Sequence, residues 1–160
     1  MTPSFDDVSR MLLEVARSIG AADLVAFDAI QSWAIALDSA DAETIVFDLS
    51  PQAGKLFVTA RVGQPPEDRR LETYARLLEI NGFWPDTGGA RFALDAADGT
   101  LTMIDDVLLH DLDAGHLETV VKDVAENARM IRSLVAVGWK IDPPQEDGPV
   151  IPGNNSAIRA

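Results

Sequence analysis

The sequence predicts an α+β fold in which a helix, three strands, a helix, two strands and a helix follow one another, with the strands in a twisted antiparallel sheet. Apolar residues recur at three- and four-residue spacing in three segments, as in amphipathic helices, and alternate with polar or small residues in five others, as in strands. The links between strands are short and turn-rich, which favours hairpins over parallel crossovers. With 160 residues, 47% of them hydrophobic, the chain suits one domain with its own core.

The first helix is expected to begin near Thr2, a plausible cap, with Pro3 at its first helical position, and to stop at Gly20. One apolar stripe runs along it. We interpret this stripe as core, and a partner-binding face is the alternative. Its members are Phe5, Val8, Leu12, Val15 and Ile19.

Three strand-like segments follow the first helix, and in each of them large apolar residues alternate with other types. The second face of the middle segment carries Val46 and that of the third carries Phe57, which is more apolar than a solvated face should be. Residues 24–27 suggest a further short edge strand. The alternating apolar residues are Trp33, Ile35 and Leu37, then Ile45, Phe47 and Leu49, then Leu56, Val58, Ala60 and Val62.

The central segment, residues 70–103, reads as an amphipathic helix, a break and a two-stranded hairpin. Leu71, Tyr74, Leu77 and Leu78 share one helical face, and Asn81-Gly82 is expected to end the helix. Residues 91–94 and 101–103 alternate as strands around the turn at residues 95–99. The longest helix is expected from about residue 114 to 137, capped by Asp113.

The composition changes after Trp139. Residues 141–160 contain four of the nine prolines and few large aliphatic side chains. We therefore divide the chain into a domain of residues 1–140 and a flexible Pro-rich tail of residues 141–160.

The charge of the chain restricts its partners. The formal net charge is -13, which repels the phosphates of nucleic acids and anionic lipids, so neither is expected as a partner. The sequence has no cysteine, and its beginning does not read as a signal peptide. No apolar run approaches the roughly 20 residues of a membrane span. The expected location is the cytoplasm.

The residue patterns favour a protein without catalysis and without a metal or cofactor. His110, Asp111, Asp113 and His116 are metal-ligand types, but their spacing fails the calcium-loop pattern and reads as an acidic loop entering the last helix. A metal-dependent enzyme built on these four stays open as a third hypothesis. Asp105-Asp106 is interpreted as a solvated pair whose side chains point apart rather than as an acid–base pair.

The central stretch carries a family resemblance. The helix closing on residues 77–81, the Gly-rich turn after it and the strand from Phe92 resemble the small acidic type III secretion chaperones of the Tir-chaperone (CesT-like) family. The similarity extends over the order of elements from about Ser4 to Val137, together with the small size, the acidity and the long final helix.

This resemblance implies a homodimer that binds the N-terminal region of secreted effector proteins and keeps it soluble and ready for export. In the family, the central helix and the following strand contribute to the dimer interface, which here implies Leu71, Tyr74, Leu77, Leu78, Phe92 and Leu94. The effector is expected to wrap over the first helix and the sheet. The residues expected there are Phe5, Leu12, Trp33, Ile35, Val46, Phe47 and Phe57.

Core positions are the alternative for several of these residues. Leu71, Leu77 and Leu78 are also compatible with the core of a monomer, and Val46 and Phe57 with packing under the last helix. Trp33 and Phe47 are more often core residues than effector contacts. For the whole chain, the alternative function is a small dimeric α+β adaptor or regulatory domain without a role in secretion.

Overall fold

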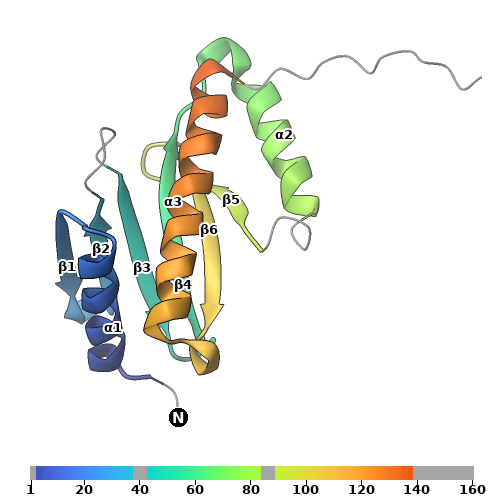
Figure 1. Ribbon diagram of the computed structural model, residues 1–160. Coiled ribbons are helices and arrows are strands. Elements are labelled where there is room, and N and C mark those ends of the chain that lie inside the picture. The colour runs from blue at the N-terminus through green and yellow to red at the C-terminus, as the bar shows by residue number, and fades with distance from the viewer. Residues whose placement is uncertain (1–2, 38–42, 84–88, 139–160) are drawn as a thin grey trace, which may run out of the picture.

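The computed structural model describes residues 3–37, 43–83 and 89–138. Within these residues the chain forms three α-helices and six strands, joined in places by short 3-10 turns. Figure 1 shows their arrangement. The predicted Pro-rich tail of residues 141–160 lies outside the described residues. In chain order the elements are α1 (Phe5–Ser18), β1 (Asp23–Phe27), β2 (Ser32–Ala36), β3 (Thr44–Ser50), β4 (Lys55–Gly63), α2 (Arg70–Gly82), β5 (Arg91–Leu94), β6 (Leu101–Leu108) and α3 (Ala114–Val137).

The six strands form one antiparallel sheet in the order β1-β2-β3-β4-β6-β5. This confirms the predicted α+β class and the order helix, strands, helix, strands, helix. The short edge strand suggested by residues 24–27 is present as β1, so four strands rather than three precede α2. Strand β6 continues to Leu108, five residues beyond the predicted end at residue 103, because it pairs with the long β4 as far as Lys55. Strands β1 and β5 are the two edges of the sheet.

Helix α1 begins two residues later than predicted. Its cap is Ser4, whose hydroxyl accepts a hydrogen bond from the Asp7 backbone N–H while the Asp7 carboxylate accepts from the Ser4 N–H. This reciprocal capping box explains the correction, because it satisfies two N–H groups that would otherwise be unpaired at the helix start. Thr2, the predicted cap, lies outside the described residues.

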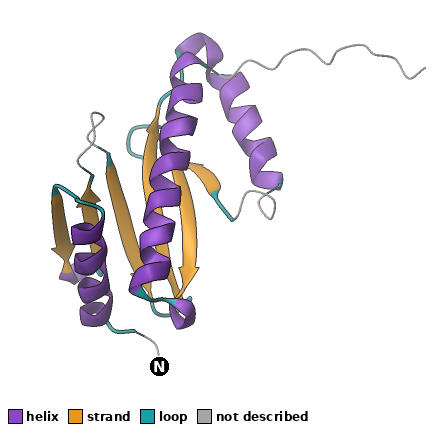
Figure 2. Cartoon of the chain, in the orientation of Figure 1, coloured by secondary structure: helices purple, strands orange, loops and turns teal. Residues whose placement is uncertain are grey.

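Helices α1 and α3 pack on the same face of the sheet and enclose the core (Figure 2). The alternating apolar residues of β2, β3 and β4 point to this face, and most of them are fully buried. Helix α3 adds Leu117, Val121 and Val124 from one side. Its start is capped by the Asp113 carboxylate, which accepts from the His116 N–H at 2.8 Å, as the sequence predicted.

Helix α2 lies beside the β5 edge of the sheet rather than over the core (Figure 1). It ends at Gly82, as the sequence predicted, and its C-cap is Phe83. Gly82 is also absent from the glycines with positive φ among the described residues, so it is not a left-handed cap. Asn81 has a different role, described below.

A buried ion pair ties α3 to the strands beneath it. The Arg132 guanidinium donates through Nη2 to Glu43 Oε1 at 3.1 Å and to the Arg61 carbonyl oxygen at 2.9 Å. The Glu43 side chain is only 1% exposed. The carbonyl of Arg61 lies where the β4–β6 register shifts, so Arg132 supplies a hydrogen bond at the irregularity in the ladder.

Candidate functional site

The histidines and their acidic neighbours lie in the turn before α3 and at the start of that helix. Asp113 is the helix cap, and His110 Nε2 lies 3.2 Å from the adjacent Asp111 carboxylate. Within residues 3–37, 43–83 and 89–138, no group of three His, Cys, Asp or Glu side chains is arranged to hold a metal ion. In the same part of the chain, none of the helices is both long and apolar enough to span a bilayer.

The adjacent carboxylates Asp105 and Asp106 point to opposite faces of β6. Asp106 lies on the face without α1 and α3, where it pairs with Lys55 at 2.6 Å and with Arg91. Asp105 lies on the face toward α3, close enough to Asp123 to be influenced by its charge. Desolvation by burial is the main cause that raises the pKa of Asp105. The two groups therefore do not form a joint acid–base site.

The strongest concentration of exposed apolar side chains lies on α2 and β5. Leu71 is 84% exposed, Leu78 68% and Leu94 50%, values that are unusual for leucine. Leu77 is 2% exposed, which places it in the core of the single chain. Between the helix and the strand lies an apolar pocket of about 210 Å³, lined by Tyr74, Leu77, Leu78, Asn81, Phe92, Ala93, Leu94 and Leu101.

The structure thus brings together five of the six residues expected at a dimer interface, all except Leu71, around one pocket. Leu71 projects from the same helix one turn earlier and is the most exposed of the six. An exposed apolar surface of this kind indicates a protein-binding site.

Asn81 is a residue of this surface that the sequence analysis did not identify as functional. Its side-chain amide donates to the Phe92 carbonyl oxygen at 2.9 Å, and its side-chain oxygen accepts from the Phe92 N–H at 2.8 Å. The sequence offers only an asparagine near a helix end, which is usually a cap, so nothing local reveals a partner eleven residues away.

A second apolar pocket, of about 430 Å³, lies between α2, β5 and α3. Met130 of α3 borders it and is 56% exposed. Its other lining residues are Ile80, Ala90, Phe92, Met103, Asn127, Ile131 and Leu134.

The face of the sheet opposite α1 and α3 is the second place where apolar side chains reach the surface. Val46 and Phe57 are half-buried there, and in the edge strand Val25 is 42% and Phe27 46% exposed. Since Val46 and Phe57 alternate with the buried residues of β3 and β4, the alternative that they pack under α3 does not hold. A pocket of about 540 Å³ extends from Phe57 toward Arg91 and Phe92 on this face.

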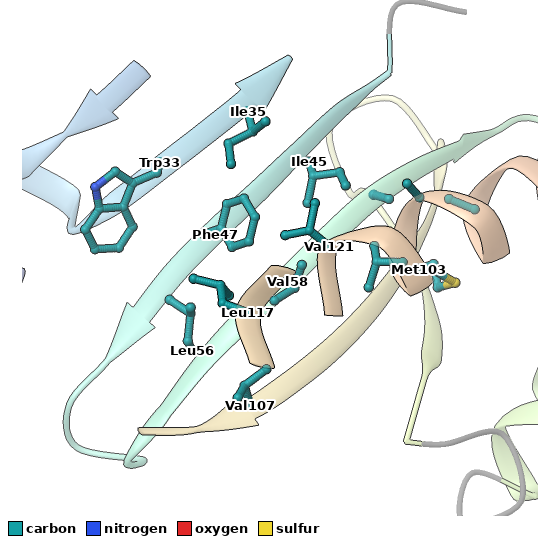
Figure 3. Close-up of a cluster of buried hydrophobic side chains, with 14 of the residues drawn as sticks. Trp33, Ile35, Ile45, Phe47, Leu56, Val58, Met103, Val107, Leu117 and Val121 are labelled. Atoms are coloured by element: carbon teal, nitrogen blue, oxygen red, sulfur yellow. The ribbon is translucent and has the colours of Figure 1, made fainter. Parts of the chain in front are cut away.

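Four of the residues expected to bind an effector belong to the core. Leu12, Trp33, Ile35 and Phe47 are 0% exposed. Figure 3 shows Trp33, Ile35 and Phe47 within a cluster of buried hydrophobic side chains. In the single chain these four residues are therefore core residues and not the surface contacts that were expected. The reason is that α1 and α3 lie on the face of the sheet to which β2 and β3 direct their large side chains.

Phe5 is the remaining member of that set and lies at the start of α1. It is half-buried and stacks on the Trp33 ring with centroids 4.4 Å apart. The Trp33 Nε1–H donates to the Ser9 hydroxyl at 2.9 Å. Phe5, Val46 and Phe57 are therefore the expected effector residues that reach the surface.

Comparisons with known proteins agree with this geometry. The model of the Tir chaperone protein (CesT) family matches residues 10–132. The comparison with curated proteins gave no match. Among solved structures, the ExsC–ExsE complex is similar with a TM-score of 0.70 at 18% identity, covering 82% of this chain and 96% of that chain.

Three further solved structures share the fold. The HopA1–SchA chaperone–effector complex has a TM-score of 0.62 at 16% identity, over 79% of this chain and 93% of that chain. The Yersinia pestis type III secretion chaperone SycH, in complex with a fragment of YscM2, has a TM-score of 0.57 at 18% identity, over 80% and 99%. YbjN, a putative transcription regulator from E. coli, has a TM-score of 0.59 at 15% identity, over 82% and 89%.

At these identities the solved structures establish the fold, and the family model, which spans most of the chain, establishes the family. The resemblance found in the sequence is thereby confirmed: the chain belongs to the Tir chaperone protein (CesT) family.

Proposed function

We propose that this chain is a cytoplasmic type III secretion chaperone that acts by binding alone. It forms a homodimer, binds the N-terminal region of a secreted effector, and keeps that region soluble and competent for export. The observation that carries the proposal is the family match over residues 10–132. The solved complexes with ExsE, HopA1 and a YscM2 fragment support it, because each pairs a protein of this fold with a second protein.

In this proposal the α2–β5 surface joins two copies of the chain. Leu71, Leu78 and Leu94 are too exposed to stabilise a monomer, and a two-fold interface buries the same patch on both subunits. Tyr74 and Phe92 complete the pocket wall that the opposing side chains would fill. Leu77, which is buried, supports the patch from below.

The effector is assigned to the open face of the sheet and the start of α1. Phe5, Val46 and Phe57 from the expected set lie there, with Val25 and Phe27 on the edge strand beside them. A disordered segment that orders on binding needs apolar contacts to offset its loss of conformational entropy. An edge strand such as β1 also offers backbone groups to an extended chain.

The net charge is consistent with a chaperone that binds aggregation-prone protein segments. Each chain carries -13, so a dimer carries -26. Such a charge keeps dimers apart in solution although apolar side chains are exposed on them.

The experiment that tests the proposal is limited proteolysis of an effector co-expressed with this chain. The secreted protein encoded beside the chaperone is the first choice of effector. Its N-terminal region should be protected from protease in the complex and cleaved in its absence, while its remaining domains show the same cleavage in both samples. Equal cleavage of the N-terminal region in both samples would contradict the proposal.

Surface variants locate the effector site in the same assay. Val46→Ser and Phe57→Ser should weaken protection, because they remove apolar contacts from the open face. Met130→Ser, on the outer side of α3, is the matched control and should leave protection unchanged. Chemical unfolding of each variant must show a folded chain, so that loss of protection reports binding.

The similarity to YbjN favours a second candidate, a dimeric adaptor or regulatory domain of the same shape without a role in secretion. Such a protein would bind a folded partner and would not prefer an unfolded N-terminal segment. Proteolytic protection confined to a folded domain of the partner would favour this candidate over a secretion chaperone.

A further inference from the structure

The two hydrogen bonds between Asn81 and Phe92 occupy the outer edge of the sheet. Phe92 lies in β5, which pairs with β6 on one side and is an edge strand on the other. The Asn81 amide donates to its carbonyl and accepts from its N–H, at 2.9 and 2.8 Å, as the backbone of a neighbouring strand would. A helix side chain thus takes the place of a seventh strand at this position.

Helix α2 buries fewer of its residues than α1 or α3. Thr73 and Leu77 are its buried residues, whereas Leu71 and Leu78 are largely exposed. It packs mainly against β5, the strand that Asn81 holds. Two directional hydrogen bonds therefore matter more for the position of this helix than they would for α1 or α3, which bury whole apolar faces.

The surface proposed for dimerisation depends on the same position. Tyr74 and Leu78 come from α2, Phe92 and Leu94 come from β5, and Asn81 lies in the wall of the pocket between them. A shift of α2 relative to β5 would move the two halves of this surface apart. Complementary surfaces lose affinity steeply when their parts are misplaced, because packing contacts act over short distances.

We propose that Asn81 is the positioning residue that seats α2 on β5 and thereby forms the surface that binds a second copy of this chain. The inference rests on the proposed homodimer. It assigns Asn81, which also lines the pocket, an effect on dimer affinity through the position of α2 on β5. The Asn81 side chain also blocks the β5 edge at Phe92 to an incoming strand. Strand β1, the other edge of the sheet, stays open to one.

The test compares Asn81→Leu with Asn127→Leu. Both replace an asparagine amide by an apolar side chain of similar size, and Asn127 lies exposed on α3, beside the other pocket. Sedimentation equilibrium gives the dimer dissociation constant, and hydrogen–deuterium exchange reports each helix separately. We expect Asn81→Leu to raise the dissociation constant at least about tenfold, as the loss of two hydrogen bonds in each subunit implies.

Exchange should accelerate in α2 and at the Phe92 amide of the Asn81→Leu variant, while α1 and α3 keep the wild-type rates. Asn127→Leu should change neither the dissociation constant nor exchange in α2. An unchanged dissociation constant in Asn81→Leu would overturn the inference. Acceleration of similar size in all helices would overturn it as well, because it would indicate general destabilisation.

Failure of the proposed dimer itself is recognised separately. If the wild-type chain sediments as a monomer at all concentrations, the homodimer is overturned, and this inference with it. If the wild type dimerises and Leu78→Asp dissociates it, whereas Asn81→Leu does not weaken it, only the role of Asn81 is overturned.

Discussion

At the scale of single residues, the face of β6 on which a carboxylate lies determines whether its charge stabilises or destabilises the fold. Asp106 lies on the open face and is paired with Lys55 and Arg91. Asp105, its neighbour, lies toward α3, where burial raises its pKa; the charge of Arg91 opposes this shift and the charge of Asp123 adds to it. Ionised Asp105 therefore costs stability, because its folded-state pKa lies above the unfolded value and the folded state holds the proton more tightly.

The first prediction concerns these two carboxylates. Asp105→Asn should raise the free energy of unfolding at pH 7, since the amide is neutral and its oxygen can still accept the Asp106 N–H, as Oδ1 does now. The gain should shrink as the pH falls toward the unfolded-state pKa of about 3.9, because wild-type Asp105 then becomes neutral as well. Urea unfolding at several pH values measures this.

Asp106→Asn is the matched control and should lower the free energy of unfolding instead of raising it. It removes two ion pairs from a side chain that is only 14% exposed, so a loss of about 0.5–1 kcal/mol is expected at pH 7. Equal effects of the two substitutions at neutral pH would contradict the assignment of the two side chains to opposite faces.

At the scale of elements, the position of α3 depends on an ion pair as well as on its apolar face. Glu43 joins the start of β3 to Arg132, and Arg132 also reaches the Arg61 carbonyl in β4. Arg129 Nη2 lies 3.9 Å from the second Glu43 oxygen. The Glu43 carboxylate is buried, so its negative charge depends on the positive charge of Arg132 for stabilisation.

The second prediction follows from this arrangement. Arg132→Met should lower the free energy of unfolding by about 3 kcal/mol, because it leaves Glu43 buried without its main partner. The double variant Glu43→Leu/Arg132→Met should recover most of that loss, since it leaves no buried charge. Arg129→Met, an exposed and distant partner, should cost less than about 1 kcal/mol. Chemical unfolding checks all three, and a double variant as unstable as Arg132→Met would refute the argument.

The elements were largely predictable because periodicity is a local property. Alternation in β2, β3 and β4, and the stripe and Asp113 cap of α3, identify those elements within a residue or two. The candidate site was less predictable. Leu77 and Leu78 are adjacent and chemically identical, yet one is 2% and the other 68% exposed.

Burial of this kind depends on which face another element covers, and that is a long-range property. Trp33 and Phe47 were expected to contact an effector and are core, because α1 and α3 both pack on their face. Val46 alternates with Phe47 and is left on the opposite face for the same reason. The Asn81–Phe92 pairing was missed because it joins a helix to a strand across the intervening turn.

At the scale of the whole molecule, two opposing effects act on association. Exposed leucines of α2 and β5 favour contact between copies, whereas a charge of -13 on each chain opposes it. Charge repulsion between subunits is screened by salt over a Debye length of about 10 Å at 0.1 M, while apolar burial is not. A homodimer built on the α2–β5 surface should therefore become tighter as the salt concentration rises.

The third prediction tests that surface directly. The wild-type chain should sediment at twice the 17.2 kDa mass of one subunit, and Leu78→Asp should shift it toward the single-chain mass. Leu78 is 68% exposed in the single chain, so the substitution costs little within a subunit, but in the dimer it places a carboxylate in an apolar contact. A loss of about 2–4 kcal/mol in dimer stability is expected for such a central residue.

Met130→Asp introduces the same charge at a 56% exposed position beside the other pocket and should leave the dimer intact. If Met130→Asp dissociates the dimer and Leu78→Asp does not, the two copies meet across α3, and the α2–β5 surface is left for another partner.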